Sequence, residues 1–581
     1  MGFNMRSTLL RRLASAVLVF GFLFSSVPFT ARAAAPDPVR GKNAMVASQH
    51  ELASKIGVEV LKKGGNAVDA AIAVGIALAV VYPEAGNIGG GGFMLIRFKD
   101  GRTTSIDYRE MAPKAAHRDI FVNDKGEVIR GDGGSTVGYR ASGVPGTLAG
   151  FEMAFKKYGS GKVKWNDLID PSVKLAKDGY VLTNRLAVLL YVYREWLAKF
   201  PESNRIFLRN GKYYEEGELF QQPELAETLA RVSKEGAKDF YTGKTAQLIA
   251  DDMKANKGLI TLEDLKNYVA KERVPLKGSY RGHEIISMPP PSSGGIVMLQ
   301  VLNMLEGYDV RGMGSGSSAK FHVLAEAMRR SFADRAEYMA DPDFADVPVA
   351  KLIDKKYAES RRATIDLAKA SASKDIKFGN VATSSEGTET THYTIVDAEG
   401  NVVSNTYTIN DLYGSRVTIK GTGVLMNDEM DDFAARPGTP NLFGLVQGER
   451  NKVEGGKRPL SSMTPTIVMT KDGRPWFAVG ARGGPRIISA VMQSVINVID
   501  HDMNIQHAID APRIHMQWLP DELAYEMYGI SPDTMKILTS YGHKFAQRPG
   551  NIASATGIMI DKEGVRLGAI DSRSDGVAVG Y

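Results

Sequence analysis

Residues Thr390-Thr391-His392 begin where a polar stretch of the chain ends, and their side chains could do nucleophilic chemistry. A threonine hydroxyl is a weak nucleophile that needs a base to take its proton. If the chain were cut directly before Thr390, the freed α-amine could be that base, because an α-amine titrates near pH 8. An N-terminal threonine nucleophile is therefore one interpretation. Threonine is also common in strands, and this segment alone favours an ordinary β-hairpin.

The residues after Thr390 predict two strands joined by a glycine turn at residues 397–401. A turn centred near Glu399 places Thr390 close to Thr408 on the second strand, with Asn410 just beyond it. His392 stands near the possible nucleophile, but side chains alternate along a strand, and we expect this histidine to have a structural role.

Other chemistries have weaker support. The glycine-rich run at residues 86–92 precedes a strand and lacks a Gly-Lys-Ser/Thr ending, so it does not favour nucleotide binding. The acidic run at residues 427–432 could cap a turn or bind calcium, although it lacks the alternating ligands and internal glycine of an EF-hand loop. There are no cysteines, and the nine histidines show no metal-binding spacing. We predict no metal and no cofactor.

The elements that would position these residues combine helices and strands. Residues 67–82 predict a helix that is apolar almost all round, and residues 93–98 and 102–108 predict a hairpin. Ser48 to Glu51 predicts a capping box for an earlier helix. Residues 149–366 are largely helical in pattern. Residues 370–389 form a polar stretch that predicts an exposed linker, and a strand-rich segment follows to residue 432.

The composition is typical of a soluble globular protein, with 581 residues, 43% of them hydrophobic and 24% charged. Residues 1–33 carry four arginines, no acid, an apolar core and a small-residue end near Ala33, which predicts a secretory signal peptide and export to a bacterial periplasm. Without them the chain has 68 basic and 66 acidic residues. We therefore expect no nucleic-acid partner, and the short apolar run predicts no stable membrane anchor.

Seven motifs resemble, in matching order, those of the γ-glutamyltranspeptidase family of N-terminal nucleophile hydrolases. The likeness runs over nearly the whole chain after the signal segment. The motifs are residues 86–93, 107–113, 288–295, 390–393, 427–433, 457–463 and 483–484.

The resemblance implies an αββα sandwich and self-cleavage between Glu389 and Thr390. Residues 34–389 would form a large chain and residues 390–581 a small one, and the two would remain together as a heterodimer. Thr390 would carry the γ-glutamyl group as an ester. Glutathione and other γ-glutamyl compounds are the implied donors, and water, amino acids or short peptides are the implied acceptors.

The resemblance also implies roles for individual side chains. Arg109 would bind the substrate α-carboxylate through its planar fork. Glu429 and Asp432 would bind the α-ammonium group. Thr408 would hold Thr390 in place. The implied further binding residues are Asn410 beside the ammonium site and Ser461 and Ser462 beside the carboxylate site.

The backbone N–H groups of Gly483 and Gly484 would stabilise the negative charge of the tetrahedral intermediate. The flanking residues Arg482 and Pro485 differ from the proline and serine common in bacterial relatives. That difference leaves the charge on the acceptor side of the site open.

Two further features bear on the substrate. Phe443 lies in a segment that resembles the lid of family members with small substrates. Asp432 favours γ-glutamyl substrates over glutaryl ones, because related acylases for glutaryl side chains tend to lack this carboxylate. The alternatives are a β-lactam side-chain acylase of the same fold and an uncleaved periplasmic protein that binds γ-glutamyl compounds or amino acids without turnover.

Overall fold

The computed structural model describes residues 36–379, 390–436, 438–442, 444–446 and 448–581. Met1–Asp37 and Pro38–Tyr581 are separate units, and the fold described below is that of Pro38–Tyr581. The predicted signal segment, Glu389 and Phe443 lie outside the described residues.

Two seven-stranded sheets form the centre of this unit, and neighbouring strands in both of them pair antiparallel. In spatial order, the first sheet consists of β18 (Val577–Gly580), β2 (Met45–Ser48), β10 (Thr391–Val396), β11 (Val402–Thr408), β3 (Gly91–Arg97), β4 (Thr103–Tyr108) and β7 (Lys271–Arg273). The second consists of β1 (Val39–Gly41), β17 (Arg566–Ile570), β16 (Ser554–Ile560), β13 (Pro475–Arg482), β12 (Thr466–Met469), β9 (His283–Ser287) and β8 (Leu276–Tyr280).

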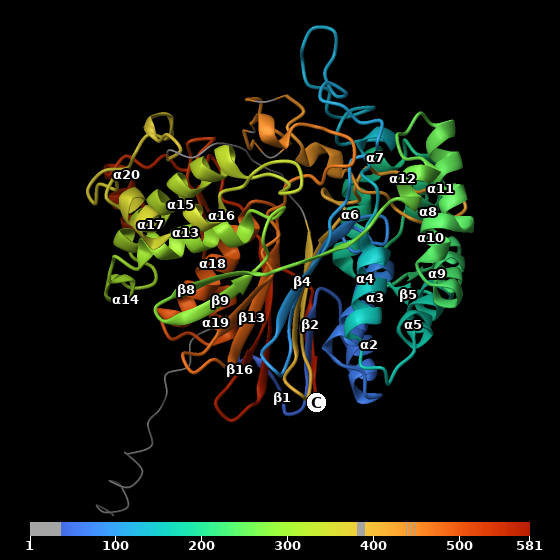
Figure 1. Ribbon diagram of the computed structural model, residues 1–581, viewed down its shortest axis with the longest axis horizontal. Coiled ribbons are helices and arrows are strands. Elements are labelled where there is room, and N and C mark those ends of the chain that lie inside the picture. Colours follow the sequence, from blue (N-terminus) through green and yellow to red (C-terminus); the bar gives the residue numbers. More distant parts are fainter. Residues whose placement is uncertain (1–35, 380–389, 437, 443, 447) are drawn as a thin grey trace, which may run out of the picture. The chain divides into compact units, whose positions relative to one another are not determined.

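The two sheets pack face to face through apolar side chains from both, including Leu95 and Val396 of the first and Ile467 and Ala478 of the second. Inward and outward side chains alternate along each strand, so every strand also has a second face that needs a cover. Helices supply it on both sides, which gives four layers and confirms the αββα expectation (Figure 1).

One helical layer covers the first sheet, with α2, α3 and α4 in direct contact with its strands. Its helices are α2 (Glu51–Lys62), α3 (Ala67–Val81), α4 (Thr147–Tyr158), α5 (Trp165–Asp178), α6 (Asn184–Val192), α7 (Arg194–Leu197), α8 (Pro201–Leu208), α9 (Pro223–Glu235), α10 (Lys238–Thr242), α11 (Lys244–Ala255) and α12 (Leu262–Lys266). The short strands β5 (Tyr180–Val181) and β6 (Leu219–Phe220) pair within this part of the chain.

The other helical layer covers the second sheet, with α13, α18 and α19 in direct contact with it. Its helices are α13 (Gly294–Leu305), α14 (Val310–Met313), α15 (Ser318–Tyr338), α16 (Val349–Leu352), α17 (Lys355–Arg362), α18 (Arg486–Ile499), α19 (Ile505–Asp510) and α20 (Pro532–Ser540). The short strands β14 (Ile514–His515) and β15 (Ala524–Tyr525) pair beside them.

Several local predictions are confirmed. Helix α3 is buried along its entire length, begins with a capping box at Asn66 and Asp69, and ends at Val81, two residues before Pro83. An apolar helix of this kind needs cover on all sides, and it lies between the first sheet and α5. The predicted hairpin is β3 and β4.

Two local predictions are wrong, and a third is confirmed with one addition. Helix α2 is capped by His50 and not by a Ser48 capping box, because Ser48 ends strand β2 and its hydroxyl bonds to Ser54 at 2.7 Å. Residues 149–366 are largely helical as predicted, but β8 and β9 add a hairpin to the second sheet that the pattern did not indicate. The strand-rich segment after Thr390 holds only β10 and β11 as full strands, and irregular backbone follows. Among the described residues, no helix is both long and apolar enough to span a bilayer.

Candidate active site

Thr390 directly precedes β10 and is 2% exposed. Thr391 lies opposite Tyr407 in the β10–β11 pairing, so one further step places Thr390 opposite Thr408, as the sequence predicts. The same row continues through the sheet, because Thr408 lies opposite Gly91 of β3. Gly92 lies opposite Tyr108, so one further step places Gly91 opposite Arg109.

Thr390, Thr408, Gly91 and Arg109 therefore form a row across one end of four adjacent strands. Neighbouring strands are about 4.8 Å apart, so the backbones of Thr390 and Arg109 are roughly 14 Å apart along this row. A long arginine side chain and a γ-glutamyl group can together bridge such a distance. The sheet thus brings the predicted nucleophile and the predicted carboxylate ligand to the same end of the sandwich.

His392 is buried, and both of its ring nitrogens have hydroxyl partners: Thr406 at 2.8 Å and Thr394 at 3.0 Å. Burial lowers the pKa of this imidazole to about 3. The ring packs against Gly480 of the second sheet, where a Cβ atom would lie only 2.3 Å from it. These contacts support the structural role. Strand alternation alone does not support this role, because it places the side chain of His392 on the same face of the strand as that of Thr390.

The pair Gly483–Gly484 follows β13 and precedes α18. Gly483 has φ 125° and Gly484 has φ 62°, values that favour glycine, and a Cβ at Gly483 would meet Ala553 Cα at 2.7 Å. Val396 and Ala478 share the buried cluster between the sheets, and Gly480 lies under His392. Two residues further along the two strands are Thr390 and Arg482, and the glycine pair begins one residue beyond Arg482.

Arg109 is 1% exposed, and its guanidinium lies among three carboxylates. It bonds to Glu429 and Asp432, and its Nη1 lies 3.4 Å from Glu110 Oε2. Carbonyl oxygens of Pro459 and Leu460 accept two more of its N–H groups, at 3.1 and 3.2 Å. We call Arg109, Glu110, Glu429 and Asp432 the pocket cluster. It joins the predicted carboxylate ligand to the two predicted ammonium ligands.

The pocket cluster has more negative than positive groups. Burial raises the pKa of Glu110 to about 7 and raises the pKa of Glu429 above its usual range, although Arg109 opposes both shifts. Glu110 Oε1 and Glu429 Oε2 are buried and have no hydrogen-bond partner among the described residues. Buried polar atoms are normally paired, so these two oxygens are candidates for contacts with a ligand.

The loop after Leu460 carries Ser461 and Ser462, both 2% exposed. Ser461 N donates to Pro291 O at 2.8 Å, and Ser293 N donates to Ser461 O at 2.7 Å. Arg335 Nη2 donates to Ser462 Oγ at 3.1 Å. The Pro/Ser/Gly loop at residues 288–295 therefore holds the two predicted serines next to the segment that receives Arg109.

Asn410 lies just beyond β11 and has φ 73°, which is rare for a residue with a side chain. Its amide nitrogen donates to Asp428 O at 3.0 Å, and its main-chain N–H donates to Thr408 Oγ1 at 2.8 Å. Its Oδ1 is buried with no partner among the described residues. This strained corner links the hairpin to the acidic segment.

Sequence reasoning did not single out Glu110 or Arg335. Glu110 stands next to Arg109 in the matched motif, and that adjacency was a usable signal. Arg335 is in the middle of α15 and carries no local signal. No group of three or more His, Cys, Asp or Glu residues in the described part of the chain could hold a metal ion.

Comparison with known proteins identifies the family of the chain. The family model described as gamma-glutamyltranspeptidase matches residues 53–581. The chain is 46% identical to the "Glutathione hydrolase proenzyme" of Escherichia coli (strain K12), with 99% of this chain and 100% of the relative covered. It is 38% identical to the "Acylase ACY 1 proenzyme" of Pseudomonas sp. (strain SE83), with 93% and 94% covered.

Two solved structures have the same fold. The cephalosporin acylase from Bacillus halodurans aligns with a TM-score of 0.83 at 27% identity, over 96% of this chain and 98% of the acylase. A Helicobacter pylori gamma-glutamyltranspeptidase chain aligns with a TM-score of 0.56 at 47% identity, over 60% of this chain and 97% of the other.

Proposed function

Because this chain belongs to the gamma-glutamyltranspeptidase family, we propose that it cuts itself before Thr390 and then transfers γ-glutamyl groups. The donors are glutathione and other γ-glutamyl compounds, and the acceptors are water, amino acids and short peptides. The observation that carries the proposal is the row of Thr390, Thr408, Gly91 and Arg109 across one end of the first sheet. This row places a buried threonine at the same end of the sheet as a buried arginine that is surrounded by three carboxyl groups.

Self-cleavage begins when the Thr390 hydroxyl oxygen attacks the carbonyl carbon of Glu389. An O–C ester bond forms, the C–N peptide bond breaks, and the hydroxyl proton ends on the freed amine. Water then opens the ester. The products are a carboxylate on the large chain and an α-amine on Thr390, which serves as the base in each later cycle.

In the catalytic cycle the amine of Thr390 takes the hydroxyl proton as the oxygen attacks the γ-carbonyl of the donor. Backbone N–H groups at Gly483 and Gly484 stabilise the oxyanion, and the proton passes to the departing amine. The resulting γ-glutamyl ester is opened by water, which gives glutamate, or by the amine of an acceptor, which gives a new γ-glutamyl peptide. Thr408 keeps the hydroxyl of Thr390 in place.

Recognition of the γ-glutamyl group requires an exchange of ion pairs. Its α-carboxylate binds the Arg109 fork, assisted by Ser461 and Ser462. Its α-ammonium binds Glu429 and Asp432, both of which pair with Arg109 in the structure. Asn410 Oδ1 is a further acceptor for the ammonium group. The substrate α-carboxylate then takes the place of an acid at Arg109, and the α-ammonium takes the place of Arg109 at the two acids.

The two chains stay together because each contributes strands to both sheets. In the first sheet β10 and β11 lie between β2 and β3, and in the second sheet β12 pairs with β9. Separating the chains would expose these sheet edges and the core between them. We therefore propose a stable heterodimer of residues 34–389 and 390–581.

A glutaryl acylase is the second candidate, since a curated relative and a structural neighbour are named as acylases. Asp432 favours the γ-glutamyl substrate, because a glutaryl group brings no ammonium to this buried carboxylate. Turnover of γ-glutamyl-p-nitroanilide against glutaryl-p-nitroanilide by the wild type separates the two. We further propose secretion to the periplasm, which N-terminal sequencing of the exported protein tests.

Intact mass spectrometry of the purified protein tests the proposed function. We expect chains of about 39 and 21 kDa, in proportion to 63.1 kDa for 581 residues, if the activated-threonine route is correct. Thr390→Ala should remain one chain and release no nitroanilide. Efficient cleavage of purified Thr390→Ala without added protease would exclude Thr390 as the processing nucleophile, and a wild type that stays uncut would favour the non-catalytic binding protein.

A further inference from the structure

A cavity of about 150 Å³ adjoins Gly483, and three arginines line it: Arg482, Arg486 and Arg573. Ser554 is also part of its wall. The cavity is formed by the end of β13, the start of β16 and the start of α18, with Gly483 between β13 and α18. We call it the Arg482 cavity.

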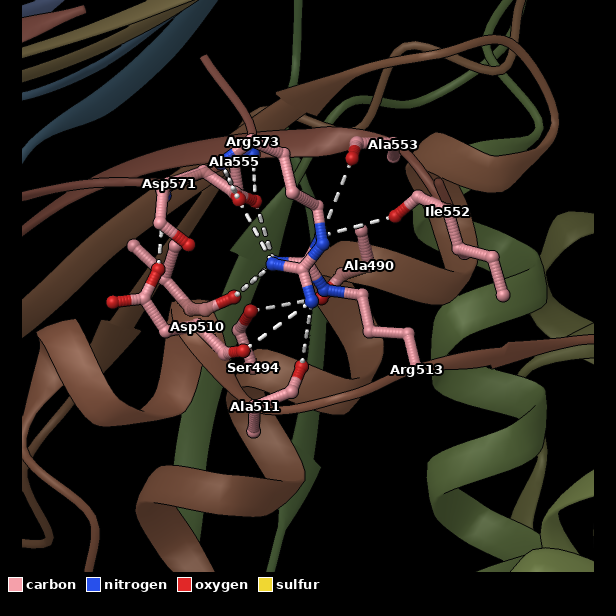
Figure 2. Close-up of polar contacts among 12 residues, drawn as sticks. Ala490, Ser494, Asp510, Ala511, Arg513, Ile552, Ala553, Ala555, Asp571 and Arg573 are labelled. Atoms are coloured by element: carbon pink, nitrogen blue, oxygen red, sulfur yellow. Dashed lines mark hydrogen bonds and ion pairs between the residues drawn. The ribbon is translucent and has the colours of Figure 1, made fainter. Parts of the chain in front are cut away.

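Charge balance distinguishes the three arginines. Arg573 is neutralised, since it donates to Asp571 at 2.8 Å (Figure 2) and to Glu526 at 2.6 Å. Arg486 donates to Asn551 O at 2.9 Å and forms no ion pair with a described residue. The cavity therefore holds more positive charge than the acids around it balance.

Arg482 is the least satisfied of the three. It forms no side-chain hydrogen bond or ion pair with any residue that the structure describes, and its Nε is buried without a partner. Its guanidinium carbon lies 5.9 Å from the centroid of the Tyr82 ring, and its charge opposes the burial that raises the pKa of Glu84, without a direct ion pair between the two side chains. Ser554 lies opposite Arg482 in the β13–β16 pairing, is 3% exposed, and its hydroxyl is also unpaired among the described residues. Two neighbouring donors thus lack an acceptor.

The position of Arg482 relates this unmet charge to the reaction. Its neighbour Gly483 is one of the two residues whose N–H groups face the reacting carbonyl. A substrate held by Arg109 at its α-carboxylate has its leaving group beyond that carbonyl. In a γ-glutamyl tripeptide the leaving group is a dipeptide, which spans about 7 Å and ends in a carboxylate. A side chain adjacent to Gly483 can reach such an end.

We infer that Arg482 binds the C-terminal carboxylate of the leaving or accepting peptide. This inference rests on the proposed function and extends it, because it names the class of partner: short peptides and amino acids with a free carboxylate. Arg486 adds positive charge to the cavity, and Ser554 supplies a hydroxyl donor. A planar guanidinium binds a carboxylate through two parallel hydrogen bonds, which a neutral side chain cannot reproduce.

The test compares two chromogenic donors that differ by one carboxylate on the leaving group: γ-glutamyl-3-carboxy-4-nitroanilide and γ-glutamyl-4-nitroanilide. For Arg482→Gln we expect the ratio of their kcat/KM values to shift about five- to tenfold toward the uncharged compound, as for a partly exposed charged hydrogen bond. Arg482→Lys, which keeps the charge but not the fork, should give a smaller shift. An unchanged ratio in Arg482→Gln overturns the inference.

Arg474→Gln is the matched control, because Arg474 lies before the other end of β13 and its side chain is 60% exposed. It should leave the ratio as in the wild type. If Arg482→Gln does not mature into two chains, the wild type still decides: N-acetylglycylglycine should inhibit hydrolysis more strongly than its C-terminal amide, and equal inhibition overturns the inference. A wild type inactive on both donors contradicts the proposed function itself.

Discussion

Two buried arginine clusters of this molecule differ in how their charges balance. The pocket cluster sets one arginine, Arg109, against three carboxylates. The other, which we call the Arg513 cluster, contains Arg513, Arg573 and Asp571 (Figure 2) together with Glu526. Arg109 and Arg513 are each 1% exposed. Burial is therefore not what separates them.

In the Arg513 cluster every carboxylate oxygen has a partner. One oxygen of Asp571 accepts from Arg513 at 2.7 Å and from Ala555 N at 2.9 Å, and the other accepts from Arg573. The oxygens of Glu526 accept from main-chain N–H groups and from Arg573. Burial alone would raise the pKa of Asp571, but the two guanidinium groups hold it below its usual range.

The pocket cluster has the opposite properties, with unpaired carboxylate oxygens and raised pKa values for Glu110 and Glu429. A cluster that serves the fold alone gains by satisfying each charge internally, because uncompensated buried charge is costly. A cluster that binds an ion of the substrate must leave some charge unmet. The difference teaches that the sign of the imbalance can indicate the ligand, and an excess of carboxyl groups favours a cation such as the α-ammonium group of the proposed substrate.

Breaking the balanced cluster should have the largest effect on stability. Asp571→Asn leaves Arg513 buried with its carboxylate partner neutralised, and we expect a loss of roughly 3–5 kcal/mol in the free energy of unfolding. Urea unfolding in the uncut Thr390→Ala background measures it on a single chain. Asp472→Asn is the control, because its pair with Arg474 is about 60% exposed on both sides and should contribute at most about 1 kcal/mol. Equal losses in the two variants would contradict the balanced-cluster interpretation.

Removing one carboxylate from the unbalanced cluster should change specificity more than stability. Asp432→Asn loses a charge-assisted hydrogen bond to the substrate ammonium, typically about 1.5–3 kcal/mol, or ten- to more than a hundredfold in kcat/KM. A glutaryl substrate has no ammonium and loses nothing in exchange. We therefore expect the ratio of kcat/KM for γ-glutamyl-p-nitroanilide to that for glutaryl-p-nitroanilide to fall.

The ratio is measured after mass spectrometry has confirmed that both proteins are cut into two chains. Asp472→Asn should keep the ratio of the wild type. If the ratio is also unchanged in Asp432→Asn, or if the wild type already prefers the glutaryl compound, Asp432 does not bind the ammonium group and the acylase becomes the better assignment.

The parts of the fold that the sequence predicted are those set by local patterns. Alternation and a glycine turn were enough for the register that places Thr390 opposite Thr408, and an unbroken apolar run was enough for α3. The hairpin of β8 and β9 was missed, because residues 276–287 mix lysine, glutamate, glycine and serine with apolar residues and owe their pairing to β12.

The candidate site was predictable only residue by residue. The motifs pointed to Arg109, Glu429 and Asp432 singly, but the direct pairing of Arg109 with the two acids joins positions more than 300 residues apart. Whether the charges of a cluster balance depends on which segments pack together. The sequence therefore could not show that the carboxylate of Asp571 is fully hydrogen-bonded or that one oxygen of Glu110 has no partner.

The smallest effect that we predict concerns the pH dependence of stability and the carboxyl of Glu110. Its pKa is raised from 4.5 to about 7 by burial, so between these values the folded chain holds a proton that the unfolded chain releases. Its contribution to stability is full below pH 4.5 and is lost as the pH rises through 7. Glutamine never ionises. Glu110→Gln should therefore gain stability relative to the parent by roughly 1–2 kcal/mol between pH 5 and pH 8. The upper limit is a change of about 1.4 kcal/mol for each pH unit over which the folded and unfolded chains differ by one bound proton. Urea unfolding at both pH values, in the Thr390→Ala background, measures this change.

Glu59→Gln, at an exposed surface pair, should show the same difference from the parent at both pH values. A Glu110→Gln difference that is constant with pH, or that falls, would mean that Glu110 is ionised throughout and that the pocket cluster carries its full negative charge before substrate binds.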